Sequence, residues 1–300
     1  MALERPGGSS LLTQWSAQPV ALALVAVLAI AYLTAMRRTG VRPRARSALF
    51  AAGLVILVWT SSGFPAVYAK SLYWVWTSQV LVLWLVVPTL LLAGNPFDLR
   101  VLHSRPLRAL ANPLIGPALL PLLSFVLFFG PLPAWAITSK PVDWLLQIVL
   151  LVVGGLMVLP LVGPDEHTGS LAIGLSLAIG SFELVLDALP GVILRLHTSL
   201  VTSWFDHRAV HSWTPAALHD QQIAGAIVWC VAELIDLPFL LIVYRRWLRS
   251  DAREAAEIDT VLEAERIARG PNDERPGQPV TDAPWWLSDP EMQERLKRQG

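Results

Sequence analysis

The chain has 300 residues, of which 54% are hydrophobic and 15% are charged, and its mean hydropathy is +0.52. This composition is too apolar for an ordinary soluble enzyme. The 23 basic residues balance the 23 acidic residues, so no net charge favours binding to nucleic acid. The charges are unevenly spread, because residues 245–300 alone hold 10 basic and 12 acidic side chains.

Seven apolar runs are long enough to cross the roughly 30 Å hydrocarbon core of a bilayer as helices. Their expected limits are 18–36, 48–66, 72–94, 114–131, 143–163, 168–190 and 220–244. The runs are rich in Leu, Val and Ala without sustained polar alternation, which favours helices over the strands of an outer-membrane barrel. We therefore predict an all-α polytopic membrane protein with seven transmembrane helices. Its parts would be a short N-terminal segment 1–17, a membrane domain 18–246 and a charged tail 247–300.

Arginines between the expected spans predict the direction of the helices, because basic residues in short loops stay preferentially on the cytoplasmic side. The loops after the first and third spans and the segment after the seventh span are basic. Their arginines are Arg37, Arg38, Arg42, Arg44, Arg46, Arg100, Arg105, Arg108, Arg245, Arg246, Arg249 and Arg253. We expect the N-terminus outside and the C-terminus in the cytoplasm of a multi-pass bacterial plasma-membrane protein.

Many of the 13 tryptophans fall near the expected external boundary, as an interfacial belt of aromatic side chains requires. They are Trp15, Trp74, Trp76, Trp135, Trp144, Trp204 and Trp213. A ligand cage is the alternative interpretation of these residues.

Acidic residues inside the sixth and seventh expected spans are costly, at about 2.5 to 3.5 kcal/mol each at the bilayer centre. Glu183 and Asp187 are spaced i, i+4, and Glu233 and Asp236 are spaced i, i+3, so each pair shares a helix face. Both pairs are expected to point into the bundle, either as hydrogen-bonding links between helices or as a functional relay. Cys230 lies one turn before Glu233, where it is either a soft ligand for Cu(I) or a small apolar residue.

The external segment 191–219 holds four of the six histidines, His197, His207, His211 and His219. Apolar residues that include Leu196, Leu200 and Trp204 recur in this segment at helical spacing, which predicts a helix lying on the membrane surface. His207 and His211 are spaced i, i+4 and would project from one side of it. Two such imidazoles can chelate copper or zinc, with His219, Asp206 or Asp220 as further ligands. The alternative is the polar face of an interfacial helix.

No phosphate-binding glycine loop, nucleophile elbow or His-Glu-x-x-His motif is present, so we do not expect an enzyme. The tail after residue 247 has mixed charge and contains the pair Trp285-Trp286. Paired exposed tryptophans favour docking to the membrane surface or to a partner protein.

Two regions resemble the multi-helix cytochrome c oxidase assembly factors, the CtaG-like family, in its actinobacterial form. The first runs from Tyr73-Trp-Val-Trp-Thr-Ser-Gln79 through Pro88 to Gly94-Asn-Pro96. The second is Asp220-Gln221-Gln222-Ile-Ala-Gly225-Ala-Ile-Val-Trp229 followed by Glu233, which is similar to the family signature Asp-Gln-x-x-Gly-Gly-x-x-x-Trp.

The resemblance implies a plasma-membrane protein that assembles an aa3-type terminal oxidase, with copper captured at the outer face and passed to oxidase subunits. It also implies roles for Asp220, Gln221 and Glu233. Many family members carry His-x-x-x-His in the third helix, where this chain has Trp76 and Val80. An accessory subunit or scaffold of a respiratory complex is therefore an alternative, and a proton- or cation-coupled transporter is a third. Expected partners are membrane lipid, the oxidase subunits and, through the tail, other respiratory-complex proteins.

Overall fold

The computed structural model describes residues 3–39, 44–94, 115–162 and 186–269, and every regular element in these ranges is a helix. The all-α class is thus confirmed for the described residues. The chain forms two compact units, residues 1–247 and 248–300.

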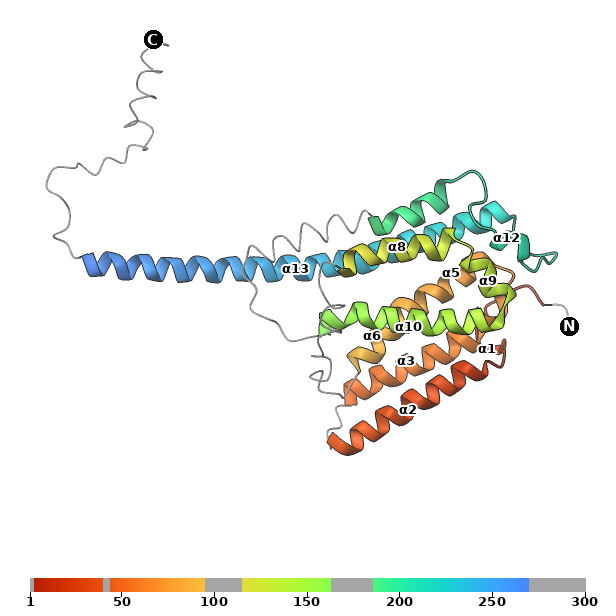
Figure 1. Ribbon diagram of the computed structural model, residues 1–300, viewed down its shortest axis with the longest axis horizontal. Helices are drawn as coiled ribbons and strands as arrows, with labels where there is room; N and C mark the ends of the chain where they lie inside the picture. The colour runs from red at the N-terminus through yellow and green to blue at the C-terminus, as the bar shows by residue number, and fades with distance from the viewer. Residues whose placement is uncertain (1–2, 40–43, 95–114, 163–185, 270–300) are drawn as a thin grey trace, which may run out of the picture. The chain divides into compact units, whose positions relative to one another are not determined.

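Helices of the first unit pack side by side (Figure 1). α2 packs on α3, α3 packs on α6, and α10 packs on α6 and on a π-helical turn, η1. The elements are α1 (Ser10–Thr13), α2 (Pro19–Thr39), α3 (Arg44–Ser62), α4 (Phe64–Tyr68), α5 (Tyr73–Leu81), η1 (Val82–Val86), α6 (Val87–Ala93), α8 (Ile115–Phe129), α9 (Leu132–Thr138), α10 (Lys140–Val162), a helix that includes residues 186–196, and α12 (Trp204–His207). The long helix α13 (Ala217–Arg269) begins in this unit.

Four helical stretches among the described residues are long and apolar enough to cross a membrane. They are Pro19–Arg38, Arg44–Tyr68, Tyr73–Ala93 and Lys140–Val158, and they coincide with the first, second, third and fifth expected spans. The fourth expected span corresponds to α8, which has 15 residues. Most of the sixth lies outside the described residues, and the seventh lies within the continuous helix α13.

The third of these stretches is an α-helix interrupted by the π-helical turn η1, within which the Val87 N–H donates to the Val82 carbonyl. Pro88 follows at once, and it cannot donate a hydrogen bond to the carbonyl of Trp84, four residues earlier. Gly154 of α10 approaches this carbonyl so closely that a Cβ atom there would collide with it. The irregular turn therefore creates the contact surface for α10.

The core is rich in aromatic side chains, of which Trp84, Trp204, Tyr68, Tyr73 and Phe128 are the largest that are fully buried. The predicted tryptophan belt is therefore wrong for Trp76 and Trp204, which are 3% and 0% exposed. Both rings pack against other aromatic rings of the core, with ring centres 5.7 Å apart for Trp76 and Tyr73 and 5.1 Å apart for Trp204 and Tyr73. Trp15 and Trp135 are more than half exposed, as residues of a belt would be.

The predicted surface helix through Leu196, Leu200 and Trp204 is also wrong. The helix of residues 186–196 ends before His197, and α12 is a separate helix of four residues. The backbone between them bonds to side chains instead of to a next helical turn. The Val201 N–H and the Ser199 carbonyl both pair with a side chain of α13, described below.

Candidate functional site

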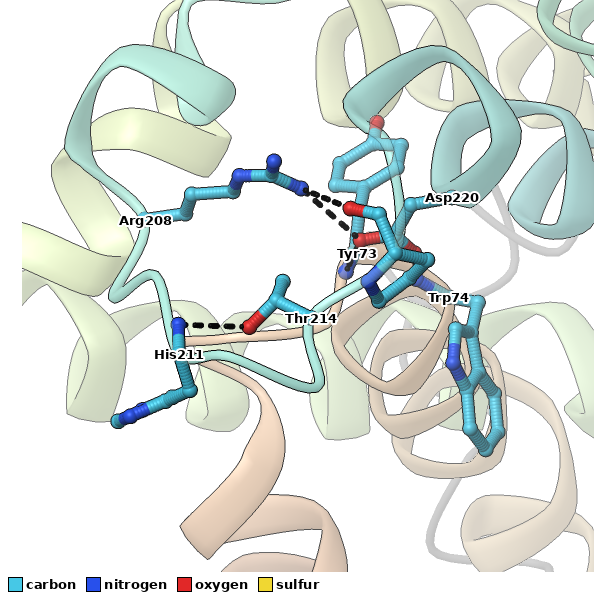
Figure 2. A network of polar contacts seen from close by, with 7 residues as sticks. Tyr73, Trp74, Arg208, His211, Thr214 and Asp220 are labelled. Carbon is cyan, nitrogen blue, oxygen red and sulfur yellow. Dashed lines mark hydrogen bonds and ion pairs between the residues drawn. The ribbon is translucent and has the colours of Figure 1, made fainter. Parts of the chain in front are cut away.

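Asp220, in the first turn of α13, stabilises the start of α5. Its Oδ2 accepts a hydrogen bond of 2.9 Å from the Tyr73 N–H, and its Oδ1 accepts one of 3.0 Å from the Trp74 N–H (Figure 2). These amides open α5 and have no partner within their own helix, and the residue before them, Leu72, has no side-chain acceptor. The carboxylate thus caps a helix that begins 147 residues earlier in the chain.

The negative charge of Asp220 is fully buried and is balanced from one side by Arg208. Arg208 Nη1 lies 3.8 Å from Asp220 Oδ2, donates a hydrogen bond of 3.3 Å to the Pro215 carbonyl, and its guanidinium sits 5.5 Å from the centre of the Phe205 ring. Two backbone N–H groups, the positive end of α5 and this guanidinium offset part of the cost of burying the carboxylate.

The next residue, Gln221, fixes the non-helical backbone before α12. Its Oε1 accepts a hydrogen bond of 2.9 Å from the Val201 N–H, and its Nε2 donates one of 3.0 Å to the Ser199 carbonyl. Gln221 is 0% exposed, so both ends of the amide are satisfied in a buried position. Consecutive residues of α13 therefore hold two different parts of the fold.

Tyr73 connects this junction to α8. Its hydroxyl donates to the Phe128 carbonyl at 3.1 Å, while its ring lies 5.1 Å from the rings of both Trp204 and Phe205 and stacks on Trp76 at 5.7 Å. We call Tyr73, Arg208, Asp220 and Gln221 the Asp-Gln junction. It joins α5, α8, the segment around α12 and α13.

Gly225 and Gly191 allow α13 to approach the helix of residues 186–196 closely. A Cβ atom on Gly225 would collide with the Arg195 amide nitrogen, and one on Gly191 would lie 2.5 Å from the Trp229 amide nitrogen. The Trp229 indole donates to Glu233 Oε1 at 3.3 Å. Of the remaining positions of the Asp-Gln motif, Gly225 therefore allows close helix packing, and Trp229 donates a hydrogen bond to Glu233.

Trp76 and Val80, the positions where the resemblance led us to look for His-x-x-x-His, are part of the core in this protein. Trp76 and Val80 are each 3% exposed, and Trp76 packs edge-on against Phe128. Gln79, where this chain keeps the residue of the family's third-helix pattern, is buried. Its Nε2 donates a hydrogen bond of 3.1 Å to the Thr60 carbonyl.

The predicted i, i+4 pairing of His207 and His211 on one helix face is wrong. α12 ends at His207, because Arg208 is extended and the Ala209 N–H donates to the Lys70 carbonyl instead of continuing the helix. The His211 ring stacks on Trp213, with ring centres 5.0 Å apart. Within the described ranges, no group of three or more His, Cys, Asp or Glu side chains is arranged to hold a metal ion.

The remaining predicted site residues are spread over the fold. His197 and His219 are exposed, as is Cys230 on α13. Glu233 is half-buried and Asp187 is buried. Glu183 and the side chain of Asp236 lie outside the described residues.

Arg208 and Tyr73 were missed as members of a site. Arg208 was predictable in part, because it is one of few basic residues between the last two expected spans. Nothing local in the sequence identifies Tyr73 N–H as the partner of Asp220.

A family model described as cytochrome c oxidase caa3 assembly factor matches residues 27–250. The chain belongs to this family. The caa3 assembly factor match covers three of the four candidate membrane spans in full and residues 27–38 of the first, and it includes the whole Asp-Gln junction. It confirms the resemblance inferred from the two motifs.

Mycobacterial proteins are among the curated relatives of this caa3 assembly factor family member. Uncharacterized proteins of Mycobacterium bovis and Mycobacterium tuberculosis are each 26% identical over 85% of the chain and 42% of their own length. One from Mycobacterium leprae is 25% identical over 82% of the chain and 41% of its own. The chain thus spans less than half the length of these relatives. No solved structure matches.

Proposed function

We propose that this protein assists assembly of an aa3-type cytochrome c oxidase in the plasma membrane. The observation that carries the proposal is the Asp-Gln junction. Residues that match the family signature form a buried network that fixes the segment around α12 to the start of α5. A family of oxidase assembly factors supplies the biological context.

The proposal includes the predicted topology of seven transmembrane helices with the N-terminus outside. Four membrane-crossing stretches support it, and arginine-rich loops give the direction. In a Cys230→Ser background, Ser212→Cys should react with a membrane-impermeant maleimide in intact cells, and Asp259→Cys should react only after lysis. The reverse pattern would contradict the orientation.

The segment around α12 is the surface that we propose for contact with an oxidase subunit. Leu196, Leu200 and Val210 are 70%, 44% and 69% exposed in this region, although the Asp-Gln junction holds its backbone firmly. Exposed apolar side chains on a fixed backbone are suited to a protein contact, because little conformational entropy is lost on binding.

Copper handling is a separate proposal, and it rests on the histidines of the same segment. The third-span positions are filled by Trp76 and Val80, whereas His197 and His207 are exposed. The His207→Ala/His211→Ala variant should bind less Cu(I) than the wild type, with His103→Ala/His167→Ala as the control. Equal Cu(I) binding by all three proteins would contradict a copper site in this segment.

A stable accessory subunit is the second candidate function, and the buried Trp76 and Val80 favour it because they remove the family's third-helix histidines. Copurification distinguishes the two. An assembly factor is expected in substoichiometric amounts with immature oxidase, whereas a subunit would accompany mature oxidase at a fixed ratio.

The function itself is tested by deleting the gene and following the oxidase on native gels. We expect less assembled oxidase, restored by the wild-type gene, with another respiratory-chain complex unchanged as the control. An unchanged oxidase band in the deletion strain would contradict the proposal.

A further inference from the structure

The part of α13 that belongs to the second compact unit carries an exposed apolar stripe. Ile258, Val261 and Leu262 are each more than half exposed, and Ala255 is exposed one turn earlier. Spacings of three and four residues place these side chains on one face of the helix, which we call the tail stripe. Within residues 248–269, the part of this unit that the structure describes, no second element covers the tail stripe. Three large apolar side chains together on a helix of mixed charge indicate a docking surface.

The borders of the tail stripe are acidic. Glu257 and Asp259 are exposed and lie about 100° to either side of Ile258 around the helix. Residues 251–265 hold six acidic side chains and one basic side chain. The tail stripe therefore suits an apolar partner that carries positive charge, and it is poorly suited to an anionic membrane surface.

A second copy of the chain fits this surface poorly. Two copies inserted in the membrane in the same direction would run parallel, so residues of equal number would face each other across the stripe. Asp251 precedes Ile258 by one heptad and falls in line with the stripe, where it would meet the Asp251 of its copy. Like charges in such a contact oppose pairing.

The end of this chain has the chemistry that the tail stripe requires. Residues 270–300 lie outside the described residues, and within them residues 285–287 are Trp-Trp-Leu. Residues 295–300 hold three basic and no acidic side chains. Large apolar side chains and positive charge therefore follow each other in the segment 285–298.

The connector between α13 and this segment is long enough for a return. Residues 270–284 contain four prolines and two glycines, a composition that opposes continuation of the helix. An extended connector of this length reaches roughly 45 Å, whereas Ile258 lies only about 17 Å along the helix from Arg269. The covalent link also keeps the segment at a high effective concentration near the stripe.

We propose that residues 285–298 fold back and dock on the tail stripe of the same chain. The two indole rings cover Ile258 and Leu262, and the basic residues of the segment lie beside the acidic borders. The stripe is then shielded, and its exposure depends on release of this segment. This inference goes beyond the assembly function and does not depend on it.

Hydrogen exchange of the full-length protein in detergent, followed by mass spectrometry, tests the proposal. In Trp285→Ser/Trp286→Ser, amides of residues 255–265 should exchange roughly tenfold or more faster than in the wild type, because a helix end without tertiary packing opens often. The matched control is Trp15→Ser/Trp135→Ser, which removes two exposed tryptophans of the first unit and should leave this exchange unchanged.

The reverse substitution separates docking from a direct effect on the helix. Ile258→Ser/Leu262→Ser removes the stripe and should also speed exchange in residues 285–298. Ile267→Ser should not, because Ile267 lies about two and a half turns from Ile258 and therefore on the opposite face.

Three results would overturn the proposal. The first is unchanged exchange of residues 255–265 in Trp285→Ser/Trp286→Ser. The second is protection of residues 285–298 that appears only in lipid nanodiscs and survives Ile258→Ser/Leu262→Ser, which would favour docking to the membrane. The third is protection that is lost when the protein is diluted, which would favour a second copy of the chain.

Discussion

Asp220 lies in the first turn of one helix, α13, and caps another, α5. Leu72 precedes α5 and cannot accept hydrogen bonds with its side chain, so the first amides of α5 depend on the carboxylate of α13. A helix end that is buried without acceptors is strongly unfavourable. The position of α13 against α5 is therefore coupled to the integrity of the third membrane-crossing stretch.

Replacing this carboxylate should destabilise the fold. Asp220→Asn leaves one acceptor oxygen, turns the other group into a donor that faces an N–H, and removes the charge opposite Arg208. We expect the free energy of unfolding to fall by about 1 to 3 kcal/mol, seen as a lower thermal midpoint in detergent.

The control for this change is Asp206→Asn, which alters an exposed acid in α12 and should shift the midpoint little. Equal midpoints for Asp220→Asn and the wild type would show that Asp220 does not cap α5.

Gln221 should control the mobility of the segment before α12 more than the global stability. Gln221→Leu removes the acceptor for the Val201 N–H and the donor to the Ser199 carbonyl. Hydrogen exchange at Val201 should become faster, while amides in the middle of α5 keep their protection. Gln222→Leu, at the adjacent half-buried position, should leave exchange at Val201 unchanged. Unaltered protection of Val201 in Gln221→Leu would show that Gln221 does not fix this segment.

The sequence predicted which residues of this site matter better than what they do. Asp220 and Gln221 were identified through the family motif, and Asp220 also as a metal ligand. Their partners, the Tyr73 amide and the Ser199 carbonyl, are backbone groups. Every residue carries such groups, so the pattern of side chains does not show which backbone group will bond to a side chain far away in the sequence.

At the scale of elements, the π-helical turn and α10 form one packing unit. Pro88 removes the donor that would bond to the Trp84 carbonyl, and Gly154 lets α10 lie against it. Interfaces between membrane helices depend on small residues of this kind, since apolar attraction alone favours no particular neighbour in lipid.

The adjacent glycines of α10 provide a matched pair of substitutions. Gly154→Ala should lower stability by about 2 to 3 kcal/mol because the new methyl group collides with the Trp84 carbonyl. Gly155→Ala meets no atom within 4 Å and should be neutral or stabilising by up to about 1 kcal/mol. Thermal unfolding of both variants in detergent measures the difference, and similar midpoints would contradict this contact.

The elements predicted well are those with a purely local signal. The stretches Pro19–Arg38 and Lys140–Val158 follow from twenty or so apolar residues in succession. The prediction of a surface helix through Leu200 was wrong although the apolar spacing is helical. The Ser199 carbonyl and the Val201 N–H bond to the Gln221 side chain instead of to a helical backbone. The turn at η1 could have been suspected from Pro88, but the sequence does not show at which residues the wider π-helical turn forms.

At the scale of the whole molecule, the protein combines four helical stretches that are apolar enough to cross a membrane with a fixed segment around α12. The family match spans both parts of this arrangement, and the chain covers less than half the length of the curated relatives. Composition predicted the membrane class, because a content of 54% hydrophobic residues is more than a soluble protein usually has. It gave no information on the Asp-Gln junction, which depends on residues from both halves of the chain.

The most direct test of the central claim is the haem a absorbance of membranes from a strain that lacks the gene. We expect a reduced haem a signal that the wild-type gene and the Gln222→Leu variant restore, and that Gln221→Leu restores less well. A haem a signal equal to that of the parent strain, without any complementing gene, would contradict a role in oxidase assembly.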